Sequence, residues 1–215
     1  MNGWNKMKPP YILVVIAIFI ILANSTAYGE EGDSSFRISR GETEYLYFAK
    51  GELCDRPKSG SRLVFKQSDF EVGIDTPKNY LGIFYVNAGV NFTTLTQEKQ
   101  EVCTPGGSES KDVPEKAFLH TRELLLTIGK EIGFVFIDVS LGQMDIKGNH
   151  YLDNVRYDTD EAFPFFKING TLQFDLFSWG HYGVELSSAA NPPSGDYTDG
   201  YINYNKISAF LKILF

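Results

Sequence analysis

Cysteine, histidine and long apolar runs are all scarce in this chain of 215 residues. It contains two cysteines and three histidines. There is no CxxC pair, and His120, His150 and His181 are scattered, so no zinc site and no other cofactor is predicted. Acidic residues outnumber basic ones by 27 to 20, a balance that argues against nucleic acid as a partner. After residue 28, no apolar stretch is long enough for a membrane-spanning helix.

The first residues have the pattern of a targeting segment. Lys6 and Lys8 precede the apolar run 11–23, and small residues follow it. The run is shorter than the ~20 residues that a spanning helix needs. Residues 1–27 are therefore predicted to be a cleaved signal peptide, and residues 28–215 a single exported domain. An uncleaved N-terminal anchor is the alternative.

The two cysteines then have a simple interpretation. In an exported chain, two cysteines usually form one disulfide, so Cys54 and Cys103 are predicted to be bonded to each other.

The rest of the chain has the two-residue period of β-strands and no helical period. In 166–176, apolar or small residues alternate with polar ones over about eleven residues, the length that a tilted strand needs to cross a bilayer. Eight strands are predicted, at residues 36–49, 61–73, 79–95, 117–128, 132–143, 162–177, 181–189 and 201–215. The second and fourth alternate poorly, which indicates bulges or misplaced boundaries.

Long and short connections between these strands alternate along the chain. The long ones are expected at 51–60, 97–116, 144–161 and 190–200, and the short ones at 75–78, 129–131 and 178–180. In an up-and-down barrel, alternate connections lie on the same side, and outer-membrane barrels have short periplasmic turns and long external loops. The prediction is therefore an all-β, antiparallel, eight-stranded membrane barrel with both ends in the periplasm. Its disulfide would join two neighbouring external loops.

The last strand completes this pattern. Every second residue is apolar, and the strand stops on an aromatic residue: Ile207, Ala209, Leu211, Ile213 and Phe215. A chain with this ending resembles the small outer-membrane barrels, the class that includes OmpA-like and OmpX-like proteins. The resemblance implies a place in the outer membrane of a Gram-negative bacterium, contact with its lipid and lipopolysaccharide, and recognition of the last strand by the barrel-assembly machinery.

Charged residues on the opposite strand faces are predicted to point into the lumen. They are Asp138, Lys167, Asp175, Glu185, Lys206 and Lys212. An eight-stranded barrel is just wide enough for side chains to fill, so these charges are expected to pair. The expected role is structural or a surface interaction, without enzymatic activity. A proton or ion path is the alternative use of such charges.

Two other functions remain open. His181, Glu185 and Ser187 share one strand face and are the side-chain types of a hydrolase. The lipid A deacylases of the PagL-like family use a His-x-Ser pair, but this chain has Glu185 where that pattern has histidine. A secreted lipocalin-like carrier of a small ligand is the other alternative. A lipocalin has an apolar cavity lining and a polar outer face, whereas here the polar strand faces would line the ligand cavity.

Overall fold

The computed structural model describes residues 33–48, 60–67, 69–104, 107–190 and 201–215. The described chain is all β and contains no helix long and apolar enough to cross a membrane. Its strands are β1 (Ser35–Phe48), β2 (Gly60–Gln67), β3 (Glu71–Asp75), β4 (Asn79–Leu81), β5 (Phe84–Thr104), β6 (Gly107–Asp112), β7 (Phe118–Ile132), β8 (Val135–Leu152), β9 (Val155–Phe177), β10 (Gly180–Ala190) and β11 (Tyr201–Leu214).

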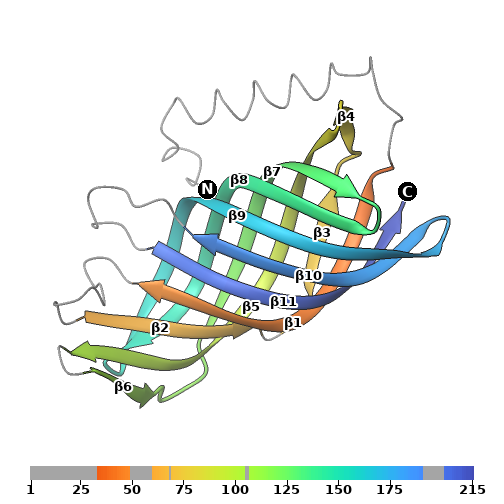
Figure 1. The fold of residues 1–215 in the computed structure, drawn as a ribbon. Coiled ribbons are helices and arrows are strands. Elements are labelled where there is room, and N and C mark those ends of the chain that lie inside the picture. Colours follow the sequence, from red (N-terminus) through yellow and green to blue (C-terminus); the bar gives the residue numbers. More distant parts are fainter. Residues whose placement is uncertain (1–32, 49–59, 68, 105–106, 191–200) are drawn as a thin grey trace.

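The strands form one closed antiparallel ring (Figure 1). Strand order is β11-β10-β9-β8-β7-β5-β2-β1, and β1 pairs with β11 along its whole length, from Ser35↔Leu214 to Phe48↔Tyr201. β2 and β3 follow each other between β1 and β5 and together take one strand position of the ring. We call each of the eight strand positions a stave. β4 and β6 are short hairpin partners of β5. The predicted eight-stranded up-and-down barrel is therefore confirmed.

The poorly alternating second segment has a local cause. The stave is interrupted between Gln67 and Glu71, and the pairing of β2 with β5 shifts register between Val64 and Phe65. A bulge or break changes which side chains face inward, so the two-residue period is lost in the sequence.

Two of the predicted long connections are wrong. Most of 97–116 is strand, because β5 continues to Thr104 and β6 pairs with it. The predicted short connection 129–131 also lies within β7, and the turn to β8 is at residues 133–134. The acidic stretch 144–161 is not a long connection, because β8 and β9 continue through it as a hairpin with a two-residue turn at Asp153 and Asn154. Both turn residues have positive φ, 49° and 64°, as a tight hairpin turn of this kind requires. The hydrophobic pattern had suggested a loop because these strand ends have a polar outer face.

The polar and apolar faces exchange places along the long strands. Near the start of β8, Leu141 is 60% exposed on the outer face while Ser140 is fully buried. Further along the same strand, Ile146 is fully buried and Lys147 is exposed. β7 shows the same exchange between its outward Leu124 and its inward, fully buried Leu119.

This exchange divides the barrel into two halves. In the membrane half, near the short turns, the outer face is an apolar belt. Its exposed members include Ile74, Phe84, Phe92, Leu124, Ile128, Ile132, Ile137, Leu141, Phe166, Ile168, Leu172, Phe174, Leu176, Tyr182, Val184, Leu186, Ile207, Leu211 and Phe215. In the other half, here called the water half, the outer face is polar and the core is apolar, as in a soluble β-barrel. Lipid outside requires the first arrangement, and water outside requires the second.

The core of the water half is a cluster of buried side chains contributed by most of the strands. It consists of Tyr45, Leu63, Phe65, Leu95, Leu119, Met144, Ile146, Phe163, Phe165, Ala189 and Tyr204. Leu125 of β7 packs against this cluster from the inner face. That contact explains why the run Leu124-Leu125-Leu126 is apolar on both faces, since its neighbours point toward lipid.

Candidate functional site

Six charged side chains meet in the lumen, five of them buried and the sixth, Arg37, 12% exposed. Three are basic and three acidic: Arg37, Lys167 and Lys206, with Glu71, Glu123 and Glu185. They come from β1, β9 and β11 and from β3, β7 and β10. We call this set the lumen charge cluster. Its formal charges sum to zero, so the cluster is internally neutral.

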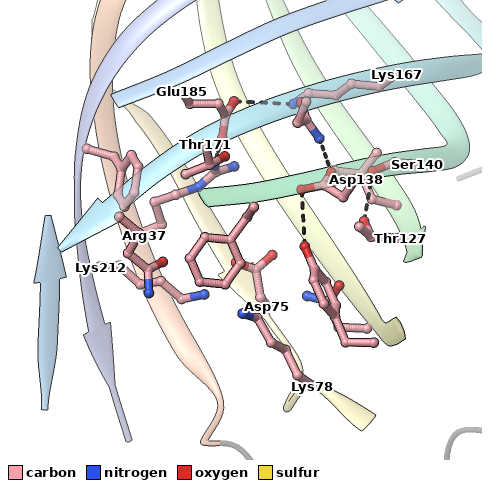
Figure 2. Close-up of a pocket in the computed structure, with 17 residues that line it drawn as sticks. Arg37, Asp75, Lys78, Thr127, Asp138, Ser140, Lys167, Thr171, Glu185 and Lys212 are labelled. Atoms are coloured by element: carbon pink, nitrogen blue, oxygen red, sulfur yellow. Dashed lines mark hydrogen bonds and ion pairs between the residues drawn. The ribbon is translucent and has the colours of Figure 1, made fainter. Parts of the chain in front are cut away.

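Each acid of this cluster touches at least one base. Arg37 pairs with Glu185 and, at 3.5 Å, with Glu71. The Lys206 Nζ lies 2.6 Å from Oε1 of Glu71. Lys167 is 3.6 Å from Glu123 and 3.8 Å from Glu185, and Figure 2 shows Lys167 and Glu185 facing each other. Charges this deeply buried are tolerable because each has an opposite charge beside it.

Neutral polar side chains complete the hydrogen bonding around the cluster. Tyr204 donates to Glu123 at 2.8 Å, and Thr93 donates to Glu71 at 3.1 Å. Asn91 donates to Glu123 at 3.2 Å and accepts from Arg37 at 3.1 Å. The bond from Tyr204 to Glu123 joins β11 to β7 on the opposite side of the ring, and the other bonds join β5 to its neighbours β3 and β7 and to β1.

Of the charges predicted to face inward, Lys167, Glu185 and Lys206 belong to this cluster. Asp138 is also buried, and its carboxylate accepts hydrogen bonds from Tyr85 at 3.2 Å and from Asn169 at 2.5 Å. Lys212 lies lower, on the lining of the cavity below the cluster.

Asp175 differs from the prediction. It shares the inward parity of β9, but it lies near the last turn, and its side chain is 85% exposed. β9 extends here beyond the end of β8, whose pairing with it stops at Leu172, so an inward-pointing side chain meets solvent instead of a packed lumen.

Three members of the cluster, Arg37, Glu71 and Glu123, were missed by sequence reasoning. Alternation in the first strand places Arg37 on the face opposite Phe36 and Ile38, and alternation in β7 places Glu123 opposite Leu124. Both signals were present in the sequence. Glu71 had no such signal, because it follows the interruption of the β2–β3 stave.

The lumen is filled above the cluster and hollow below it. Above, fully buried side chains such as Leu95, Leu119 and Met144 occupy the ring. Below lie a cavity of about 80 Å³ and, at the turn-side mouth, a wider one of about 440 Å³, and both are lined by Lys78 and Lys212. In the described part of the barrel, the hollow space therefore opens toward the turns and ends at the charge cluster, which does not favour an ion path.

The hydrolase candidates do not meet. The Nδ1 of His181 is 2.8 Å from Oδ1 of Asp175 at the turn-side mouth. Ser187 lies six residues further along β10, about 20 Å at the rise of a strand, and is buried beside Asn169 and Lys206 in the ladder. Glu185 is held by Arg37. This arrangement gives Ser187 no histidine to activate it.

The predicted disulfide falls partly outside the described residues. Cys54 lies in the segment 49–59, which is not described, and for Cys103 only the backbone in β5 is. The predicted signal peptide, residues 1–27, also lies outside the described chain.

The closed ring, the lipid-facing belt and the charged lumen together define the class of protein. The chain is a small β-barrel of the outer-membrane class, and its location is the outer membrane. The polar lumen also excludes the lipocalin-like interpretation, which required an apolar cavity and a polar outer face throughout.

No family model matches the chain, and no curated protein sequence matches it. Among solved structures, Ail, the attachment invasion locus protein of Yersinia pestis, is 13% identical with a TM-score of 0.45, over 86% of this chain and 100% of that one. Neisserial surface protein A (NspA) is 6% identical with a TM-score of 0.48, over 87% and 100%. The outer membrane protease OmpT from Escherichia coli is 10% identical with a TM-score of 0.42, over 89% and 100%. Likenesses this distant say nothing about activity.

Proposed function

We propose that this barrel is a non-enzymatic scaffold that holds its long connections at the cell surface, where they contact other molecules. The observation that carries the proposal is the water half of the barrel. There the strands continue past the apolar belt with a polar outer face and an apolar core. This half raises the strand ends that border 49–59 and 191–200 above the lipid. Recognition usually lies on loops that a rigid scaffold positions.

The rim of the water half is firmly built, as a scaffold requires. The amide of Gln97 in β5 exchanges two hydrogen bonds with the backbone of Tyr151 at the tip of β8, at 2.8 and 2.7 Å. The amide of Gln100 accepts a hydrogen bond from the backbone N–H of Asp153 at 2.7 Å and donates one to its carboxylate at 3.1 Å. These contacts fasten the β8–β9 hairpin to β5.

A disulfide between Cys54 and Cys103 fits this proposal. Pairing of β2 with β5 places Cys103 opposite Gly60 in the ladder, six residues along the chain from Cys54. A bond there would staple the segment 49–59 to the rim and restrict its motion.

Lipid A phosphate is the membrane partner that the outer surface supports. On β7, Arg122 lies two residues from Leu124 on the same outer face, on the side of the belt toward the water half. On β1, Arg40 lies two residues from Ile38 in the same direction. Arginine recognises phosphate through paired hydrogen bonds, and this edge is the level of the lipid headgroups. Arg122 also pairs with Asp145, so it is already oriented along the surface.

The proposal is tested by labelling intact cells. An epitope inserted after Pro193 is expected to bind antibody on intact cells, whereas the same epitope inserted at Gly133, in the β7–β8 turn, is expected to bind only after permeabilisation. Shortening 191–200 to a two-residue turn should reduce adhesion of the cells to a fixed epithelial layer while heat-modifiable gel migration is retained. Labelling of the Gly133 insertion on intact cells would show that the barrel has the opposite orientation in the membrane. Unchanged adhesion after shortening each long connection would refute the surface role.

The enzymatic alternative is tested separately. Ser187→Ala is expected to leave the lipid A acyl pattern of the cells unchanged, as measured by mass spectrometry. A changed pattern with a folded barrel would establish a hydrolase instead.

A further inference from the structure

The turn-side mouth holds a cavity of about 440 Å³, a volume within the range of small-molecule sites. The polar and charged groups that line it include Lys78, Gln173, Asp175, His181 and Lys212, together with two further acids, Asp33 and Glu131. Its remaining walls include the rings of Phe134, Phe136 and Phe174. The cavity is separate from the loop-bearing rim and has no part in the surface role proposed above.

Lys212 is the uncommitted charge of this cavity. It comes from β11 with inward parity and lines both the inner and the outer hollow. Among the residues drawn in Figure 2, no interaction joins Lys212 to another side chain, although Lys167 and Asp138 nearby are both bonded. Over the described ranges, its ammonium makes no ion pair, whereas Lys167 and Lys206 each make two.

Lys78 lies in the same cavity as Lys212, and the charge of Lys212 affects its pKa. Its ammonium lies 3.9 Å from the centre of the Phe136 ring and 3.4 Å from Oε2 of Glu131. Burial, followed by the positive charge of Lys212, lowers the pKa of Lys78 to about 8. Glu131 is already engaged by Lys78 and by the hydroxyl of Tyr80 at 3.1 Å. Lys212 therefore has no acid within ion-pair distance in the described chain, and Asp75 and Asp138 act on its charge only from further away.

Deeper polar atoms also lack hydrogen-bond partners. The Oδ1 atoms of Asn87 and Asn169 and Nε of Arg37 are buried and make no hydrogen bond in the described chain, and Oε1 of Glu185 makes none besides its ion pairs at 3.8 Å to Lys167 and Lys206. All four residues line the inner hollow, and Lys212 lines both this hollow and the cavity at the mouth. Buried polar atoms are normally satisfied by protein, water or ligand, so this hollow suits polar molecules.

The rim of the same cavity carries the opposite charge. Asp175 is 85% exposed, and one oxygen of its carboxylate is held by His181 at 2.8 Å. His181 pairs with Lys212 in the β10–β11 ladder and with Asp175 in the β9–β10 ladder, so the three groups lie in one row across adjacent strands. The ammonium of Lys212 inside the cavity and the carboxylate of Asp175 at its rim can together bind a molecule that carries both charges.

We propose that the turn-side cavity binds a small zwitterion of the amino-acid or short-peptide class. Its carboxylate lies on the ammonium of Lys212, and its ammonium lies on the carboxylate of Asp175. The aromatic walls bind the apolar part of the molecule, and the amide of Gln173 supplies a further hydrogen bond between the two charged ends.

Calorimetric titration of the folded barrel in detergent micelles tests this site, since both mouths are then accessible. Glycylglycine is expected to bind, whereas acetate and ethylammonium, each with one of its charges, are expected to bind about tenfold more weakly or not at all. Lys212→Met should weaken glycylglycine binding about tenfold or more. Lys147→Met, a matched change at a side chain that is 78% exposed, should have no effect.

Asp175→Asn provides a second variant whose folding is not in question, because the side chain is largely in solvent. It should weaken glycylglycine and leave acetate unchanged. Equal binding of acetate and glycylglycine would overturn the zwitterion, and binding unaffected by Lys212→Met or by Asp175→Asn would overturn the site.

Discussion

At the scale of single residues, the most consequential side chain is Lys167. It is 1% exposed and forms ion pairs with both Glu123 and Glu185. Lys167→Met would leave two buried carboxylates short of a partner, so we expect a loss of about 3–5 kcal/mol of stability. Urea unfolding of the barrel in micelles measures this loss. Lys147→Met is the control, since its ion pair to Asp160 spans 3.9 Å in solvent, and a similar loss there would contradict the special role of the lumen charge cluster.

A second prediction at this scale concerns pH. His150, in the water half near the β8–β9 turn, is buried, and its Nδ1 is 2.8 Å from the hydroxyl of Thr159. Burial lowers the pKa of His150 from 6.5 to about 4. Between these values the unfolded state binds a proton that the folded state does not, so stability should fall as the pH falls from about 6.5 to about 4.

Hydrogen exchange of residues 148–160 at several pH values measures this effect. We expect the protection factors, which correct for the intrinsic pH dependence of amide exchange, to fall toward pH 4 in the natural chain and to change less in His150→Gln. His120→Gln changes an exposed histidine and serves as the control. An unchanged pH profile in His150→Gln would show that another group causes the loosening.

At the scale of elements, the closing strand β11 determines whether the ring forms. Leu211 is 41% exposed on the outer face, whereas Lys212 faces the lumen. An arginine on the lipid face costs about 2–4 kcal/mol near the bilayer midplane. Leu211→Arg is therefore expected to reduce assembly, and Lys212→Gln to be tolerated. Heat-modifiable migration of membrane fractions compares the two.

Deletion of Phe215 belongs to the same element. Its ring is 69% exposed at the end of the apolar row. We expect the deletion to slow assembly without affecting export, since it removes the terminal aromatic residue and leaves the targeting segment intact. Normal assembly of Leu211→Arg together with failed assembly of Lys212→Gln would show that the apolar face of this strand points inward.

At the scale of the whole molecule, one set of strands is adapted to two surroundings, lipid along one half and water along the other. In its membrane half, apolar side chains face outward and a neutral set of six charges crosses the lumen above a hollow. In its water half, the core is apolar and the outer face is polar. The seam between the halves crosses β7 and β8 near Glu123 and Gly142, where the inward residues change from polar to apolar. A barrel built this way is closed above the membrane and hollow only toward its turns.

The sequence by itself determined the strand class, the antiparallel order and the lipid-facing row of the last strand. These follow from side-chain alternation and from turn positions, which are local properties of the chain. In the segment 166–176 and in the row ending at Phe215, the large apolar side chains of one face, such as Ile168 and Ile207, are exposed, which is the alternation that the sequence shows.

Only the tertiary structure decided the remainder. The stretch 144–161 looked like a loop because its outer face meets water, and water contact depends on how high each stave stands above the belt. The lumen charge cluster was half visible, because parity shows that Lys167, Glu185 and Lys206 face inward but not which partners meet them across the ring. Those partners, Arg37, Glu71 and Glu123, are set by the tilt and register of strands far apart in the chain, and no local pattern encodes that register.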